Sequence, residues 1–460
     1  MNNRARGRYP IVLSVTADRK TTLGSSSSAL DTRTILKFYL PLAASWVLMG
    51  MDGPVNVGVI QRLPHPELGA ASFAVLLSLS IWIESPIIDL LATATTLASS
   101  RDRYLLLRRF VGSLILWVTA AHAMVSATPL YWTVTERVMG LPHELAVSVR
   151  PALIILIPWS GLIGWRRTHQ GVMIRNGLTK AIGFGTGLRG IALVVVAFGM
   201  LELEPQISSP IIASLSLIAS VAVEAVFIHF VSQSAIRSLP LKSSEEPLTT
   251  RRLIAFHFPL TATTMINLLV GPLVAAGLAR THDPIRALAA YQVASAFFFL
   301  FRMITFCIPE VVITLGKDAQ SIQALKRFSL NIGALGSGAM VLMAVSGLDR
   351  FLFGTVLHAP PNIVQLAHLT FFGCAALPII DAAQSYVRGV LTAQFRTTSR
   401  LVAVGAALAG LGLALVMGVV LAWPGFVIVG SAITASLACE LLVLVVAVRR
   451  PMPAGLATGT

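Results

Sequence analysis

Residues 38–58, FYLPLAASWVLMGMDGPVNVG, form an apolar run that is long enough to cross a lipid bilayer. Pro41 and the pair Gly53-Pro54 interrupt this run, and Asp52 places a single carboxylate near its middle. Because proline removes a backbone hydrogen bond and crowds the preceding turn, we expect helix breaks at these positions. A membrane span that is broken beside a carboxylate is the feature that the rest of the chain has to explain.

The pattern returns in the second half of the chain, where residues 256–277 read FHFPLTATTMINLLVGPLVAAG. A common offset of 218 positions relates Pro41 to Pro259, Gly53-Pro54 to Gly271-Pro272, and Gly171-Val172 to Gly389-Val390. Three matches at one offset indicate duplication of a unit of roughly 200 residues. The second copy has Val270 in place of Asp52, so the carboxylate belongs to the first copy alone. Further helix breaks are expected at Pro259, Gly271 and Pro272.

Composition places the chain in a membrane. Of its 460 residues 55% are hydrophobic and 12% charged, and the mean hydropathy is +0.79, which excludes a soluble globular protein. Apolar runs of about 20 residues span a bilayer, and they must be helical because backbone groups in lipid need internal partners. We expect an all-α polytopic protein of about twelve transmembrane helices in two six-helix bundles. The predicted spans are residues 34–60, 70–98, 109–131, 148–174, 177–201 and 208–233, then 253–279, 287–315, 328–348, 363–390, 401–423 and 425–448.

Charge patterning predicts how the chain lies in the membrane. The net charge of +15 comes from Lys and Arg in short loops between apolar runs, which argues against nucleic-acid binding. Alternate loops are the more basic, and they share a side with the basic N-terminus, so both termini are expected in the cytoplasm and the chain in the cytoplasmic (inner) membrane. The predicted divisions are a disordered cytoplasmic tail (1–33), a first bundle (34–233), a cytoplasmic linker (234–252), a second bundle (253–450) and a C-terminal tail (451–460).

An even number of spans per copy predicts that the copies are related by an axis along the membrane normal, with a cavity between them. The sequence has no phosphate-binding loop, no HExxH motif and no hydrophilic domain for an ATPase, so we expect no enzymatic activity. Its three cysteines lie inside apolar segments without metal-type spacing, and we expect neither a metal nor a cofactor.

Ionisable residues inside the predicted spans carry the functional signal. A charge at mid-bilayer costs about 2.5–3.5 kcal/mol even on lenient scales, so such residues usually face a cavity or a partner. Asp52 is the first candidate for coupling to a proton or Na+, because carbonyls freed at the helix break can help a carboxylate to hold a cation. Glu310 and Asp89 are further ion-coupling candidates, and structural clamps between helices are the alternative. The spans also contain Glu84, Glu224, Asp381 and Glu440. Of these, Glu224 and Glu440 lie in the sixth spans of the two copies and match as repeat-equivalents.

Five arginines also lie within the predicted spans, with few acids nearby in the sequence. A guanidinium stays ionised and forms a fork that suits phosphate or carboxylate, so this set predicts an electropositive cavity for an anion. The alternative is that some of these side chains reach the cytoplasmic interface. The candidate substrate-binding residues are Arg166, Arg167, Arg189, Arg302, Arg388, Asn56 and Gln292.

The chain resembles the multidrug/oligosaccharidyl-lipid/polysaccharide (MOP) exporter superfamily, whose members have twelve spans in two halves. The run 288–291 (LAAY) is similar to the entry of a span in multidrug and toxin extrusion (MATE) members, and Asp52 resembles their ion-coupling aspartate in the first helix. A closer likeness is to the progressive ankylosis (Ank) family. The residues that carry it are Phe38 to Leu42 with Asp52, residues 100–103 (SRDR), Thr168-His169 with Gly171, Phe256 to Leu260 with Pro272, Glu310 and Glu440.

This resemblance implies an outward-directed exporter of organic anions or phosphorylated metabolites. We therefore expect a secondary active transporter that works by alternating access, with antiport against a proton or Na+ gradient as its energy source. A flippase for a polyprenyl-diphosphate-linked glycan also needs a cationic cavity and is the nearest alternative. A membrane scaffold without transport activity is the third, although a scaffold needs neither the repeat nor buried charges. The expected partners are a small anionic solute or lipid-linked substrate, a coupling cation and the lipid bilayer.

Overall fold

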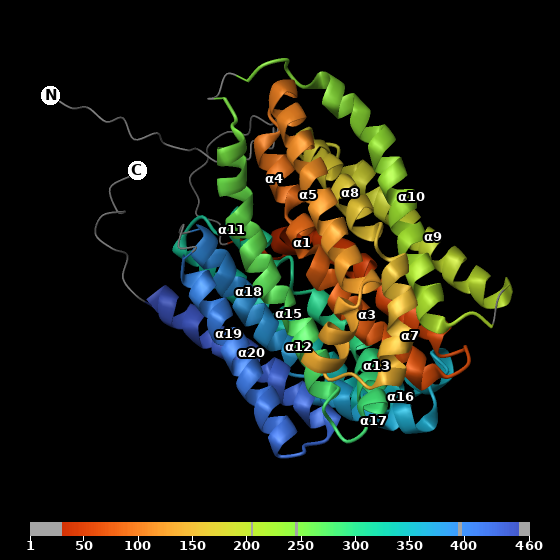
Figure 1. Ribbon diagram of the computed structural model, residues 1–460. Coiled ribbons are helices and arrows are strands. Elements are labelled where there is room, and N and C mark those ends of the chain that lie inside the picture. The colour runs from red at the N-terminus through yellow and green to blue at the C-terminus, as the bar shows by residue number, and fades with distance from the viewer. Residues whose placement is uncertain (1–29, 204–205, 244–246, 394–397, 450–460) are drawn as a thin grey trace.

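The computed structural model describes residues 30–203, 206–243, 247–393 and 398–449, and every regular element within these ranges is helical (Figure 1). Eleven helical segments there are long and apolar enough to cross a membrane. The number is twelve when α7 and α8, which meet at 45°, are counted as one span. All twelve predicted spans are confirmed, and the protein is an all-α membrane protein built from two six-helix bundles.

The first bundle contains six spans, of which three are interrupted. Its helices are α1 (Thr32–Gly50) with α2 (Asp52–Ile60), α3 (Pro66–Ile88) with α4 (Leu90–Leu97), α5 (Arg101–Ala127), α7 (His143–Ile155) with α8 (Trp159–Arg175), α9 (Thr179–Leu203) and α10 (Ser209–Ser238). The second bundle repeats this order with α11 (Thr250–Leu268) and α12 (Val270–Leu278), α13 (Pro284–Met303) and α14 (Ile308–Leu315), α15 (Ala319–Ser346), α17 (Pro361–Gly373) and α18 (Leu377–Ala393), α19 (Thr398–Val420) and α20 (Gly425–Arg449).

Short elements follow the third span of each bundle: α6 (Leu130–Trp132) with the π-helix η1 (Thr133–Val138), and α16 (Leu348–Phe351) with the π-helix η2 (Leu352–Val356). From α1 to α8, most helices begin 218 positions before their counterparts from α11 to α18, whereas α10 begins 216 positions before α20. Because two separate chain segments reproduce the same breaks at the same spacing, the internal repeat extends to the level of individual helix turns.

Some boundaries differ from the predicted ones. The third span begins at Arg101 rather than 109, and the ninth at Ala319 rather than 328. The apolar run marks only the part of the helix that lies in lipid, and the helix continues beyond it. At the ninth span Asp318 caps the helix by accepting a 2.8 Å hydrogen bond from the Ser321 backbone N–H. Helices α10 and α11 likewise extend into the predicted linker. Residues 1–29 of the predicted tail, 244–246 of the linker and 451–460 lie outside the described residues.

The first span of each bundle breaks near its Gly-Pro pair. Helix α1 ends at Gly50 and α11 ends at Leu268, four residues before Pro54 and Pro272 respectively. This spacing follows from the clash of a proline ring with the carbonyl four residues earlier. In contrast, α1 runs through Pro41 and α11 through Pro259, so the breaks predicted at those two prolines are wrong. The carbonyls that they leave unpaired belong to exposed residues near the helix starts, where water can replace the missing donor.

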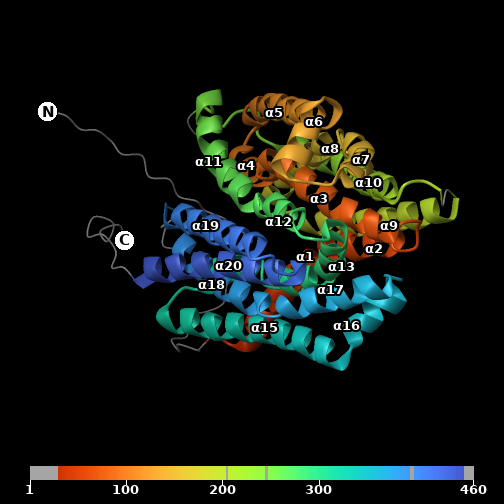
Figure 2. The same ribbon diagram turned by 60° about the horizontal axis from the view of Figure 1, so that its bottom comes forward.

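The two bundles exchange parts of their first spans (Figure 2). Helix α11 lies beside α3, α4 and α5 of the first bundle, while α1 packs against α13, α14 and α15 of the second. The Tyr39 hydroxyl donates a 2.8 Å hydrogen bond to the Ile304 carbonyl, and His257 Nε2 lies 3.0 Å from the Pro86 carbonyl. These two contacts are equivalent under the 218-residue repeat, so each bundle holds the other by the same device. We call this contact region the seam.

A second reciprocal contact lies at the end of the molecule opposite the chain termini. Arg62 Nη2 donates a 2.8 Å hydrogen bond to the Val356 carbonyl, and Arg280 Nη2 donates a 2.6 Å bond to the Val138 carbonyl. Each arginine thus joins its own bundle to the π-helix of the other bundle. Glu67 adds two contacts between the bundles there, with Arg286 and Asn362. The bundles are closed against each other at this end by polar contacts that can be broken without unfolding either bundle.

The repeated glycines Gly171 and Gly389 allow close helix packing. A Cβ atom on Gly171 of α8 would lie 2.6 Å from the Leu91 carbonyl oxygen in α4, and one on Gly389 of α18 would lie 2.8 Å from Val312 Cβ in α14. We expect Gly171→Ala to lower the free energy of unfolding by about 1–3 kcal/mol, because backbone has to shift. Gly183→Ala in α9 is the matched control, since its Cβ would meet open space. Equal melting temperatures for the two variants in detergent would contradict this packing.

Candidate functional site

Four of the five predicted arginines form ion pairs with acids from other spans. Buried charges require partners, and tertiary packing brings those partners from distant parts of the sequence. The expectation of few acids near these arginines is therefore wrong for four of them, and their ion pairs count against the electropositive cavity predicted from the sequence. The pairs are Arg166 with Glu224, Arg189 with Asp52, Arg302 with Asp381, and Arg388 with Glu440.

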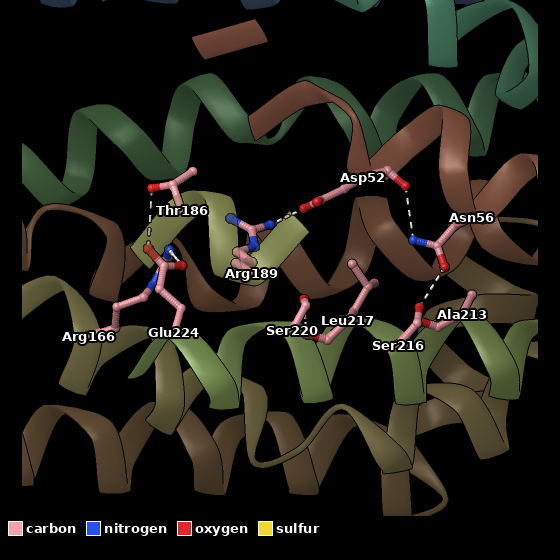
Figure 3. Close-up of polar contacts among 10 residues, drawn as sticks. All are labelled: Asp52, Asn56, Arg166, Thr186, Arg189, Ala213, Ser216, Leu217, Ser220 and Glu224. Carbon is pink, nitrogen blue, oxygen red and sulfur yellow. Dashed lines mark hydrogen bonds and ion pairs between the residues drawn. The ribbon is translucent and has the colours of Figure 1, made fainter. Parts of the chain in front are cut away.

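Asp52 lies where the first span is broken. It is the first residue of α2, and its carboxylate pairs with Arg189 from α9 (Figure 3). The unpaired N–H groups and the dipole of a helix N-terminus favour a negative charge at this position. The side chains of Asp52 and Arg189 are 23% and 9% exposed, so the pair is covered but still accessible. The carboxylate is therefore not fully enclosed by the bundle.

Asn56 ties the broken span to α10. Its Nδ2 donates a 2.9 Å hydrogen bond to the Asp52 carbonyl, and its Oδ1 accepts a 2.7 Å bond from the Ser216 hydroxyl (Figure 3). All acceptors and donors in this chain of contacts come from three different helix segments, α2, α9 and α10. The position of the Asp52 carboxylate is therefore fixed by the backbone around it as well as by Arg189.

Glu224 is the centre of a second, deeper group. It is fully buried in α10 and pairs with Arg166 from α8. Gln170 Nε2 donates a 3.0 Å hydrogen bond to Glu224 Oε1. The Thr186 hydroxyl lies 3.5 Å from the same oxygen (Figure 3). Thr186 stands one helical turn before Arg189 in α9, so this group adjoins the Asp52 pair. We call the two groups together the polar cluster of the first bundle.

The second bundle reproduces one of these groups and lacks the other. Glu440 takes the place of Glu224, and the two residues that contact the acid's helix have changed places, since Gln384 corresponds to Arg166 and Arg388 to Gln170. At the positions of Asp52, Arg189, Asn56 and Ser216 the second bundle has only apolar residues: Val270, Ala407, Val274 and Ala432. The Glu224 group is thus common to both bundles, whereas the Asp52–Arg189 pair is specific to the first.

Of the remaining candidates, Arg167 interacts electrostatically with Glu224 of this cluster, and the others lie elsewhere on the spans. Arg302 binds Asp381 through two hydrogen bonds of 2.6 and 3.2 Å, within the second bundle. Asp89 lies at the break between α3 and α4, Gln292 is buried in α13, and Glu310 is exposed in α14. In Arg167 the Nε atom has no hydrogen-bond partner. Of the predicted residues, the structure brings together Asp52, Arg189, Asn56 and Arg166.

Sequence reasoning missed Gln170, Thr186 and Ser216. A signal for them exists, because Ser216, Ser220 and Glu224 recur every four residues and so line one face of α10. Arg166 and Gln170 have the same spacing in α8. Polar residues four apart in an otherwise apolar span are a pattern that predicts a shared partner on a neighbouring helix.

Comparison with known proteins identifies the fold. No protein-family model and no curated protein matches the sequence. Among solved structures, the inward closed lipid II flippase MurJ aligns over 89% of this chain and 88% of its own, with 12% identity and a TM-score of 0.66. The eukaryotic MATE transporter AtDTX14 covers 91% and 96% at 13% identity and a TM-score of 0.62. The Vibrio cholerae MATE transporter VcmN covers 91% and 97% at 14% identity and a TM-score of 0.61.

These similarities confirm the expected MATE-like fold. The structures that the chain resembles are transporters and a flippase. At identities of 8–14% the likeness establishes the fold and leaves the choice of substrate to the residues of this chain. The likeness to the Ank family stays a prediction.

Proposed function

We propose that this chain is a secondary active transporter that works by alternating access between its two bundles and is coupled to a proton or Na+ at Asp52. The observation that carries the proposal is the Asp52–Arg189 pair at the broken first span, whose counterparts in the second bundle are Val270 and Ala407. A pair needed only for folding would be expected in both copies of a duplicated scaffold. Its restriction to one copy, together with the MATE-like fold, supports a role in transport.

Coupling follows from competition for the carboxylate. Ionised Asp52 holds the Arg189 guanidinium, whereas a proton or Na+ on Asp52 weakens that attraction and releases the arginine. The break at Met51 separates α1 from α2, so the two parts of the first span can change their angle when the pair opens. The reciprocal contacts of Arg62 and Arg280 at the far end are separate from the pair and would open in the alternate conformation.

Which substrate can bind also depends on whether the Asp52–Arg189 pair is closed or open. Arg166, Arg302 and Arg388 are already neutralised, and Arg167 interacts with the buried acids Glu84 and Asp89. An anionic solute or phosphorylated metabolite can therefore bind Arg189 mainly when Asp52 has taken up a cation. Anion and cation would then be carried in the same conformation, which is cotransport. Export by exchange against a cation requires the opposite, a substrate that competes with the cation for Asp52 and is therefore positively charged. The charge of the substrate therefore determines whether the coupling is cotransport or exchange.

The flippase alternative shares the same chemistry. MurJ, which this chain resembles in fold, is a lipid II flippase, and a lipid-linked diphosphate would also require a free guanidinium. The basic loops on the side of both termini support an orientation with that side in the cytoplasm, and in a bacterium this is the inner membrane.

A transport assay with purified protein in liposomes tests the proposal. Labelled citrate, a nucleotide and a cationic dye are offered with a proton gradient, with a Na+ gradient and with neither, and a fluorescent lipid-linked diphosphate is tested for flipping. We expect accumulation of one solute class that depends on one of the gradients. Cotransport of citrate or nucleotide would support an anion at Arg189, and exchange of the dye would support a cation at Asp52. Solute movement that never exceeds that of empty liposomes under any gradient would refute the transporter.

A further inference from the structure

The seam contains a histidine that lies between the two bundles. His257 belongs to α11 of the second bundle, and its ring is 3% exposed. Nε2 lies 3.0 Å from the Pro86 carbonyl of α3, and Nδ1 lies 2.9 Å from the Thr93 hydroxyl of α4. Pro86 and Thr93 flank Asp89, the residue at which the second span is broken. The imidazole therefore bridges the broken span of one bundle and the crossing helix of the other.

The repeat provides an internal control for the role of this histidine. At the equivalent contact in the other half, Tyr39 donates to the Ile304 carbonyl. The residues that surround the two contacts differ in kind, since Asp89, Thr93 and Thr261 on the histidine side correspond to Cys307, Val311 and Ala43 on the tyrosine side. A single hydroxyl therefore suffices to hold the seam. Packing alone therefore does not explain why titratable groups surround His257.

The hydrogen-bond geometry accommodates both the neutral and the protonated imidazole. Nε2 lies 3.0 Å from both the Pro86 carbonyl and the Thr261 hydroxyl, and because a carbonyl only accepts, a hydrogen on Nε2 is donated to Pro86. The Thr93 hydroxyl has one hydrogen and two acceptors within reach, His257 Nδ1 at 2.9 Å and the Asp89 carbonyl at 3.0 Å. In the neutral ring Thr93 donates to Nδ1. When Nδ1 is protonated it donates to the Thr93 oxygen, and the Thr93 hydroxyl then donates to the Asp89 backbone carbonyl. No polar atom loses its partner in this exchange.

Burial opposes a positive charge on the His257 ring, whereas the nearby Asp89 carboxylate favours it. The Asp89 carboxylate interacts with His257 and with Thr264 of α11, and Arg167 of α8 is the cation nearby. Glu84 of α3 adds a second buried acid, and one oxygen of each carboxylate has no hydrogen-bond partner. Arg166 also acts on Glu84, although it is already paired with Glu224. On the α5 side the ring of Phe110 lies 5.5 Å from the His257 ring. Two acids thus share one unpaired arginine.

We propose that His257 and Asp89 form a second proton-binding site, separate from Asp52, and that the proton held there fastens α11 to the first bundle. The imidazolium replaces two neutral hydrogen bonds across the seam by charge-assisted ones and adds its attraction to Asp89. Loss of the proton weakens the same contacts. The seam is thereby expected to be tighter at acid than at alkaline pH.

The test measures the distance between the bundles as a function of pH and needs no substrate. Spin labels are placed at Lys180→Cys in the first bundle and Gln320→Cys in the second, both exposed positions near the end that carries the termini, with the native cysteines replaced by alanine. The Asp52→Asn background silences the proposed coupling site. Distance distributions are recorded by pulsed electron paramagnetic resonance in liposomes from pH 4.5 to 8.5.

We expect a single pH-dependent shift in the Asp52→Asn protein and none when His257→Tyr is added, because tyrosine keeps the contact of the other repeat without titrating near neutral pH. Asp89→Asn should move the midpoint to lower pH. Tyr39→Phe, which weakens the equivalent contact, should leave the midpoint unchanged. Should His257→Tyr fail to fold, His257→Gln supplies the same donor and acceptor as the neutral ring. An unaltered shift in a folded His257 variant, or no shift in the parent protein, would overturn the proposal.

Discussion

Replacement of Glu224 by glutamine is expected to lower the free energy of unfolding by about 3–5 kcal/mol, the cost of leaving a buried charge without its partner. The Arg166 and Glu224 side chains are 5% and 0% exposed, so water cannot take over the lost interaction. Gln170 and Thr186 also direct their polar groups at the lost carboxylate. The measurement is the thermal or denaturant-induced unfolding of the purified protein in detergent, followed by tryptophan fluorescence.

The second bundle supplies the control for this prediction. Glu440→Gln removes the equivalent acid, but its partner Arg388 is 29% exposed and can be hydrated in part, so the loss should be smaller. The double variant Arg166→Gln with Glu224→Gln should recover most of the stability, because both charges are removed and Gln384 already occupies the equivalent position in the second bundle. Equal losses for the Glu224 and Glu440 variants would show that burial does not govern these pairs.

The membrane spans could be predicted from sequence because their signal is local. Each apolar run contains enough residues to cross a bilayer, and lipid permits only helix for such a run. The repeat added the breaks, since Pro54 and Pro272 end a helix four residues earlier in both copies. The misplaced breaks at Pro41 and Pro259 have a physical reason as well. Near a helix start water can satisfy the carbonyl that proline leaves unpaired, and sequence alone does not say how near water lies.

The site was predictable in part. A carboxylate beside a helix break can be recognised in the sequence, and Asp52 does lie at the break of the first span. Its partner Arg189 is 137 positions away in another span, and helical periodicity gives the face of a span without telling which span it meets. Four of the arginines therefore look unpaired in the sequence, although each forms an ion pair with an acid on another helix. Pairing of charges between spans is tertiary information.

Comparison of the two copies recovers some of that information. Where both copies keep a polar contact, as at Glu224 and Glu440, the contact is needed for the fold of a bundle. Where one copy keeps a contact that the other replaces with apolar residues, as at Asp52 and Val270, folding alone does not require it. At the seam both copies keep a hydrogen bond, but Asp89 and Thr93 beside His257 are replaced by Cys307 and Val311 beside Tyr39, so folding alone does not require those two residues. Duplication thus allows structural and functional charges to be distinguished within a single chain.

Asp52→Asn is expected to abolish accumulation of substrate against its gradient while leaving the protein folded. Asparagine keeps the volume and the hydrogen-bond acceptor for Arg189, and it mimics the protonated carboxylate. A gradient of one pH unit can sustain roughly tenfold accumulation for each coupled proton, and the variant should reach only about equal concentrations on both sides. Uptake into liposomes with and without the gradient measures this ratio, and exchange of labelled for unlabelled solute reports whether substrate still binds.

Two further variants decide whether the effect belongs to the carboxylate of Asp52. Asp52→Glu retains a titratable group at the break and should retain part of the gradient-driven uptake. Glu310→Gln removes an exposed carboxylate from α14 and should behave as the parent protein. Full accumulation by Asp52→Asn would exclude Asp52 as the coupling site, and Glu310 would then be the next carboxylate to test. Loss of both accumulation and exchange would instead mean that the Asp52–Arg189 pair shapes the substrate site, because a pure coupling group can be neutralised without preventing solute from binding.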